Sequence, residues 1–181
     1  MIQEIYQKAM KFAGEKHCNQ KVPGSSANYL LHISNVAMEI LTAYNNQPEF
    51  DLAFTVQVAI LHDVLEDTET SFKELEDHFG TEVTIGVLAL TKDESLPTKK
   101  EAMADSLKRI NEQRFEVGML KLADRIINLQ QPPNHWTQEK MENYLEEAKL
   151  ISNQLNGKND YLNLRLEKKI KDYYERYCSP K

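Results

Sequence analysis

Four residues that could bind a metal ion or transfer a proton lie close together in an otherwise apolar segment, and they are His62, Asp63, Glu66 and Asp67. Steps of three and four residues bring side chains to one face of a helix, so these groups are predicted to form one patch. Apolar residues at positions 56, 58–61, 64 and 65 predict that this helix is central and mostly buried. Because buried carboxylates need a cation, the patch indicates a divalent metal site rather than an exposed helix end.

Two further residues, His32 and Asp124, could complete the metal site from other helices. Neighbours on a helix point about 100° apart, so His62 and Asp63 can share an ion only near the helix surface, and other ligands must come from elsewhere. His32 and Asp124 each interrupt an apolar helical segment. Taken alone, His32 could be a hydrogen-bonded core histidine, and Asp124 could pair with Lys121 or Arg125. Together, imidazole and carboxylate ligands favour a first-row ion such as Mn, Fe or Zn.

Glu66 and Asp67 follow the predicted ligands by one helical turn. A bound ion would lower the pKa of a water molecule, and these carboxylates could orient that water, take its proton or protonate a leaving oxygen. The alternative is that they only end the helix. The helix dipole disfavours acidic residues at a C-terminal end, so we favour the catalytic interpretation, with Glu66 as the group that moves the proton.

The bulk composition excludes several classes of partner. The formal net charge is −6, which gives no support for binding to nucleic acid or to an anionic membrane. No apolar run approaches membrane-spanning length, and the N-terminus lacks the features of a signal peptide. Cys18 and Cys178 lack metal-site spacing and are expected to be reduced thiols, so the predicted location is cytoplasmic. The sequence carries no signal for an oligomeric state.

Helical spacing of apolar residues along most of the chain predicts one all-α domain over residues 1–181, with about eight to ten helices. The predicted helices cover residues 2–16, 28–44, 50–66, 71–79, 81–90, 98–113, 116–130, 138–155 and 161–177. Side chains suited to capping the helix starts are Ser71, Thr98, Thr137 and Asp160. Loops are expected at residues 17–27 and 91–98.

The order His, His-Asp, Asp on separate helices resembles the HD-domain metal-dependent phosphohydrolases. The HDxxED form at residues 62–67 resembles their (p)ppGpp hydrolase branch, and within it the single-domain small alarmone hydrolases of the Mesh1 type. The match spans roughly residues 5–175 and includes no synthetase domain. The segments that carry it are Phe12-Ala13, Lys16-His17, Gln20-Lys21, Tyr29 with His32, AILHDVLEDT at 59–68, FGTEV at 79–83, LTKDESLP at 90–97, KLADRIINL at 121–129, and Trp136 with Tyr144.

This resemblance implies an HD-domain helical bundle with a Mn(II) ion held by four residues: His32, His62, Asp63 and Asp124. It implies hydrolysis of the 3′-pyrophosphate of ppGpp or pppGpp, giving GDP or GTP and pyrophosphate. The phosphates need cations, and those available are Lys21, Lys92, Lys99, Lys100, Lys121, Arg125 and Lys140. The family pattern favours Lys21 beside the base, Asn128 at the ribose or phosphate, and Lys140 with Tyr144 on the C-terminal helix. Lys99 and Lys100 could reach a distal phosphate from their loop.

Three departures from the family pattern surround the loop expected beside guanine. Lys21 is followed by Val22 rather than by a second basic residue, and PGSSAN at 23–28 replaces the usual Gly-x-Pro-Tyr run. Ile33 follows His32 at a position where the family commonly has proline. Base specificity therefore stays open, and another nucleotide such as NADPH, cleaved at its 2′-phosphate, is an alternative substrate. A non-catalytic nucleotide sensor is a third hypothesis, and the presence of every expected ligand and acid argues against it.

Overall fold

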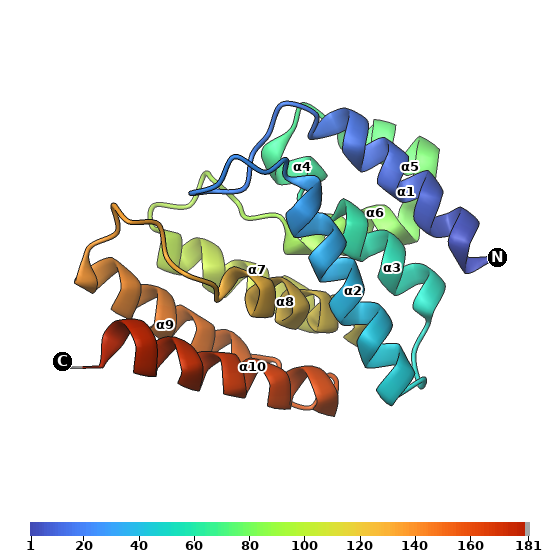
Figure 1. Cartoon of the computed structure of the whole chain (residues 1–181). Helices are drawn as coiled ribbons and strands as arrows, with labels where there is room; N and C mark the ends of the chain where they lie inside the picture. The colour runs from blue at the N-terminus through green and yellow to red at the C-terminus, as the bar shows by residue number, and fades with distance from the viewer. Residues whose placement is uncertain (180–181) are drawn as a thin grey trace.

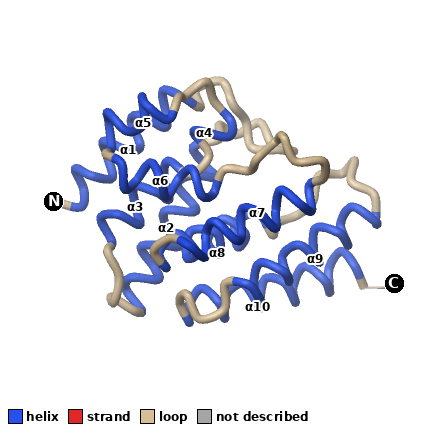
Figure 2. Tube along the Cα trace, turned by 180° about the vertical axis from the view of Figure 1, so that it is seen from behind, coloured by secondary structure: helices blue, strands red, loops and turns tan. Residues whose placement is uncertain are grey.

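The computed structural model describes residues 1–179, which form ten α-helices, one π-helical turn and connecting loops. Over these residues the only β-type pairing is an isolated bridge between Lys21 and Asn28, so the prediction of an all-α fold is confirmed (Figure 2). The elements are α1 (Ile2–Lys16), α2 (Leu30–Asn46), α3 (Leu52–Leu61), α4 (Val64–Asp67), α5 (Phe72–Phe79), α6 (Thr81–Leu90), α7 (Lys99–Glu112), α8 (Phe115–Asn128), α9 (Gln138–Gln154), α10 (Asp160–Tyr173) and the π-helix Tyr174–Cys178.

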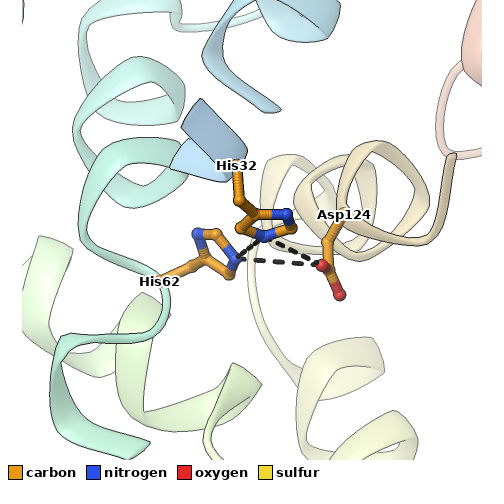
Figure 3. Close-up of side chains that lie close together, drawn as sticks. All are labelled: His32, His62 and Asp124. Atoms are coloured by element: carbon orange, nitrogen blue, oxygen red, sulfur yellow. Dashed lines mark hydrogen bonds and ion pairs between the residues drawn. The ribbon is translucent and has the colours of Figure 1, made fainter. Parts of the chain in front are cut away.

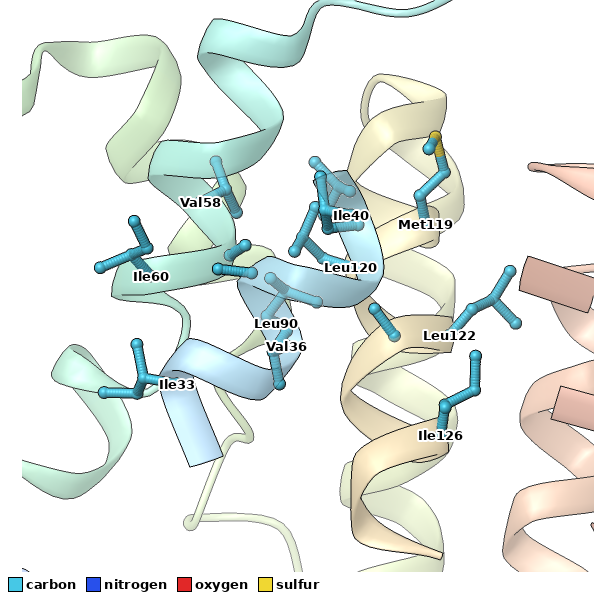
Figure 4. Packing of buried hydrophobic residues seen from close by; sticks show 14 of the residues in the cluster. Ile33, Val36, Ile40, Val58, Ile60, Leu90, Met119, Leu120, Leu122 and Ile126 are labelled. Atoms are coloured by element: carbon cyan, nitrogen blue, oxygen red, sulfur yellow. The ribbon is translucent and has the colours of Figure 1, made fainter. Parts of the chain in front are cut away.

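Helix α8 forms the centre of the molecule. It contacts α2, α3, α6, α7, α9 and α10. In Figure 1, α9 and α10 run side by side below α8, and α1, α3, α5 and α6 lie above it. Side chains of α2, α3 and α8 interlock in the core, as Figure 4 shows. Fully buried residues on these helices include Ile33, Val36, Ile40, Val58, Ile60, Met119, Leu122 and Ile126, and Figure 4 shows Leu122 and Ile126 on the side of α8 that points away from α2 and α3.

The prediction of one continuous helix over residues 50–66 is wrong, because the chain breaks between α3 and α4. The Nδ1–H of His62 donates to the carbonyl oxygen of Ala59 at 2.8 Å, an acceptor that a continuous helix would use for the N–H of Asp63. Asp63 has φ −103° and ψ −1°, outside the regular helical region. The break lets the side chains of two consecutive residues meet, since His62 Nε2 and Asp63 Oδ2 are 2.8 Å apart.

Side chains cap the N-terminal ends of several helices around the site. The hydroxyl groups of Ser71, Thr98 and Thr137 each accept a hydrogen bond from the backbone N–H three residues later, as predicted. The prediction that Asp160 caps the last helix is wrong. Asn159 is the cap, because its backbone is extended (φ −164°, ψ 123°) and its side chain accepts from the first turn, whereas Asp160 is already helical.

Two other boundaries differ from the sequence prediction. Helix α2 begins at Leu30 instead of residue 28, because the Asn28 side chain accepts a hydrogen bond from the Leu30 N–H and forms a turn first. The last helix changes to a π-helix at Tyr174.

Cys18 and Cys178 are both free thiols. No helix within residues 1–179 is long and apolar enough to cross a membrane.

Candidate metal centre

Three buried side chains from three helical segments converge on one point: His32 from α2, His62 at the end of α3, and Asp124 from α8 (Figure 3). The two Nε2 atoms are 3.3 Å apart, and Asp124 Oδ1 lies 3.5 Å from His32 Nε2 and 3.9 Å from His62 Nε2. All three potential ligand atoms lie within 4.8 Å of one another. One divalent ion could therefore contact all three, which is the arrangement that the sequence predicts.

Asp63 adds a fourth potential ligand atom at the edge of this cluster. Its Oδ2 lies 2.8 Å from His62 Nε2 and 3.7 Å from His32 Nε2. The same oxygen accepts a hydrogen bond from the Tyr29 hydroxyl group at 2.5 Å. Tyr29 stands one helical turn before His32, so the start of α2 contributes both a potential ligand and a group that orients another.

Neighbouring groups hold the potential ligands in position. The Nδ1–H of His62 is used by Ala59, so its Nε2 faces the cluster. Asp124 accepts from the Lys121 ammonium group at 3.2 Å through Oδ2 and from the Asn128 amide at 2.5 Å through Oδ1. The predicted substrate residue Asn128 thus contacts a potential metal ligand directly. Hydrogen bonds from neighbouring groups to the ligand side chains fix the orientation of those side chains in metal sites.

The ionisation of the cluster shows its need for positive charge. Burial lowers the pKa of His62, but the adjacent Asp63 carboxylate raises it more, to about 9. Burial raises the pKa of Asp63 and Asp124, but the neighbouring cationic groups, His62 for the first and Lys121 for the second, bring both below the usual range. Burial and the proximity of His62 lower the pKa of His32. A proton on His62 supplies a charge that a divalent cation could supply instead, so these donors fit a metal ion.

Two acidic side chains on α4 lie beside the cluster. Glu66 accepts from the Lys92 backbone N–H at 3.0 Å and from the Lys92 ammonium group at 2.9 Å. Asp67 accepts from the Gln20 amide at 2.9 Å. Burial raises the pKa of the Asp67 carboxyl group, and the charges of Asp63 and Glu66 raise it further. The two acids therefore have different surroundings, one held by a cation and the other by a neutral amide.

The cluster opens into a cavity of about 130 Å³. Its walls carry six of the site residues predicted from the sequence, together with residues that the sequence did not single out. The lining residues are Tyr29, His62, Asp63, Glu66, Asp67, Leu90, Lys92, Leu120, Lys121, Asp124 and Asn128. Lys92 and Lys121 were only two among many available cations in the sequence. Two sequence features could have pointed to these lysines. Lys92 lies two residues after the end of α6, and Lys121 lies three residues before Asp124, on the same face of α8.

Four of the predicted substrate residues are not part of this wall in the described structure, which covers all of them: Lys21, Lys99, Lys140 and Tyr144. Lys21 and Lys99 are exposed, on the 17–29 loop and at the start of α7. The Lys140 ammonium group lies over the Trp136 ring, 4.5 Å from its centre. Tyr144 packs edge-on against Trp136, with ring centres 5.1 Å apart. Their proposed substrate contacts stay predictions.

Replacing Tyr29 with phenylalanine should weaken metal binding by about 10- to 100-fold, because Asp63 loses the hydroxyl group that orients it. The affinity for Mn(II) can be measured by calorimetry on metal-free protein. The control is Tyr44→Phe, since the Tyr44 ring packs against Phe50 away from the cluster. Equal Mn(II) affinity in Tyr29→Phe and in the unmodified protein would show that the hydroxyl group has no such role.

Known proteins share this sequence pattern and fold. A family model described as HD domain matches residues 9–160. Guanosine-3′,5′-bis(diphosphate) 3′-pyrophosphohydrolase MESH1 of Danio rerio is 31% identical over 163 residues, covering 87% of this chain and 88% of that protein. The Homo sapiens protein of the same name is 31% identical over 159 residues, covering 85% and 86%.

A solved structure of a metazoan orthologue of SpoT, described as hydrolysing ppGpp, has a TM-score of 0.80 and 29% identity. The match covers 93% of this chain and 94% of that one. The resemblance read from the HDxxED motif is confirmed by both the family model and these relatives. This chain therefore belongs to the HD-domain family and, within it, to the group that contains the MESH1 proteins.

Proposed function

We propose that this protein is a Mn(II)-dependent hydrolase that removes the 3′-diphosphate of ppGpp or pppGpp. The products are GDP or GTP and pyrophosphate. The observation that carries the proposal is the convergence of His32, His62 and Asp124 next to a cavity whose wall holds two further acids, Glu66 and Asp67. The proposal is supported by MESH1 relatives named as 3′-pyrophosphohydrolases that match over most of their length.

The metal ligands in this proposal are His32, His62, Asp63 and Asp124. Nitrogen and oxygen ligands together suit Mn, with Fe and Zn as alternatives. A divalent ion held there would lower the pKa of the attacking water and polarise the phosphoryl group. Lys121 and Asn128 keep the Asp124 carboxylate oriented, and Tyr29 does the same for Asp63.

Glu66 and Asp67 divide the proton transfers in the proposed reaction. Glu66 accepts a proton from the water molecule as the water oxygen bonds to the phosphorus atom attached to the ribose 3′-oxygen. The bond between that phosphorus and the 3′-oxygen breaks, and pyrophosphate leaves. Asp67 gives a proton to the 3′-oxygen, a role that fits its raised pKa. The water thus contributes its hydroxyl group to pyrophosphate, and the nucleoside keeps a 3′-hydroxyl group.

The test is a hydrolysis assay on purified protein. We expect pyrophosphate release from ppGpp with Mn(II), loss of that release after treatment with a chelator, and its return when Mn(II) is added back. The same panel contains NADPH, because the altered 21–28 loop leaves base specificity open. A strong preference for NADPH would replace ppGpp as the substrate, and nucleotide binding without turnover of any compound would favour a sensor.

Further sequence predictions remain part of this proposal. They are a single HD-type domain over residues 1–181, of which 180 and 181 lie outside the described residues, a cytoplasmic location, and no nucleic-acid or membrane partner. The negative net charge supports the last two exclusions. A nucleotide with many phosphates must therefore be attracted by the local metal site and by nearby lysines rather than by the whole protein.

A further inference from the structure

Lys92 contacts the acid Glu66 at two points. Its backbone N–H donates to Glu66 Oε2 at 3.0 Å, and its ammonium group donates to Glu66 Oε1 at 2.9 Å. The backbone contact comes from a loop residue just after α6 and is fixed by the fold. The ammonium contact comes from the end of a flexible four-carbon side chain. One carboxylate oxygen is therefore permanently held, and the other is held by a group that can move.

The Lys92 ammonium group is also the cation of the cavity wall that a ligand can reach. An ammonium group has three donors, and Glu66 is its one hydrogen-bond partner within residues 1–179. The Lys92 side chain is 38% exposed, whereas the other lysine of the wall, Lys121, is 9% exposed and is paired with Asp124. Burial lowers the pKa of Lys92, but the Glu66 charge raises it more, so the group is charged at neutral pH.

The charge of the cavity wall leaves room for this role. The wall carries four carboxyl groups, from Asp63, Glu66, Asp67 and Asp124, and two ammonium groups. With Asp67 protonated, as the proposed reaction requires, one divalent ion leaves the wall with a small net positive charge. A phosphate chain then needs further positive charge close by, and Lys92 can supply it by turning from Glu66.

We infer that Lys92 binds the phosphate chain of the substrate and, in doing so, releases one oxygen of Glu66 for proton transfer. This inference rests on the proposed hydrolase function. Before binding, the ammonium group occupies Glu66 Oε1. When phosphate enters, the ammonium group moves to a phosphate oxygen, and the Lys92 backbone N–H keeps Glu66 in place through Oε2. No covalent bond changes in this exchange, and Glu66 becomes able to accept a proton only when substrate is present.

The inference is tested with the full-length protein loaded with Mn(II), using Lys92→Met and Lys92→Arg. We expect KM for ppGpp to rise about tenfold or more in Lys92→Met, since hydrogen bonds to charged groups have effects of this size. The affinity for pyrophosphate, measured by calorimetry in a fixed excess of Mn(II), should fall by a similar factor. Lys92→Arg keeps the charge and should recover most of the affinity. The matched control is Lys108→Met, an exposed lysine on α7.

Each outcome decides the inference. A lower kcat with unchanged KM and unchanged pyrophosphate affinity would overturn it, because Lys92 would then only position Glu66. Unmodified protein that fails to hydrolyse ppGpp removes the proposed function, yet the pyrophosphate titration still tests Lys92 separately. If thermal melting shows that Lys92→Met is unfolded, Lys92→Gln takes its place, and weaker binding that arginine restores supports the inference.

Discussion

His62→Ala is expected to lower kcat/KM for ppGpp by about 10³-fold or more and to remove most of the bound metal. The His62 imidazole makes the shortest contacts in the cluster, because its Nε2 lies 2.8 Å from Asp63 Oδ2 and 3.3 Å from His32 Nε2. Without it, the two carboxylates face a cavity that cannot hold an ion in the same geometry. Loss of electrophilic activation is worth several kcal/mol, and about 4 kcal/mol corresponds to a factor of about 10³.

The measurements for His62→Ala are metal content by elemental analysis and steady-state turnover on the same sample. His78→Ala is the matched control, because His78 is an exposed histidine on α5. Circular dichroism checks that both variants keep their helices. A His62→Ala protein that holds one equivalent of Mn(II) and turns over normally would mean that the cluster is not the metal site.

Glu66→Gln should reduce kcat by about 10²- to 10⁴-fold, the usual range for loss of a general base. The amide keeps the shape of the side chain and can still accept from the Lys92 backbone N–H. Metal and nucleotide binding should therefore survive while turnover collapses. Calorimetry with ppGpp and single-turnover kinetics separate these effects.

Glu69→Gln is the control for this variant, since Glu69 is an exposed acid three residues further along the chain. Full activity in Glu66→Gln, together with loss of activity in Asp67→Asn, would transfer the role of base to Asp67. The contacts make this a real distinction, because Lys92 holds Glu66 and the Gln20 amide holds Asp67.

The helices and the potential metal ligands were predictable because both depend on local pattern. Apolar residues at helical spacing specify which faces are buried, and Ser71, Thr98 and Thr137 mark helix starts by short-range hydrogen bonds. A polar residue within a buried face, such as His32 or Asp124, must have a partner whatever the fold. Such residues are therefore recognisable from their neighbours in the sequence.

The residues of the cavity wall were less predictable because most exposed lysines look alike in a sequence. Lys99 and Lys140 were as plausible as Lys92 for binding phosphate, yet of these three lysines only Lys92 lies on the described cavity wall. Its place depends on how the loop after α6 folds back onto α4, over a separation of 26 residues from Glu66. Pairing over such a distance leaves no periodic signal.

Apolar spacing, helix caps and the His, His-Asp, Asp order were enough to specify an all-α HD-domain chain with a predicted divalent metal site. Two features could be identified only from the tertiary structure: the helix break at residues 62–63 and the two-point contact between Lys92 and Glu66. Helical propensity alone continues α3 through His62, whereas the fold replaces one helical hydrogen bond with a side-chain bond to Ala59. Contacts between distant segments depend on how helices pack, and packing is a property of the assembled core.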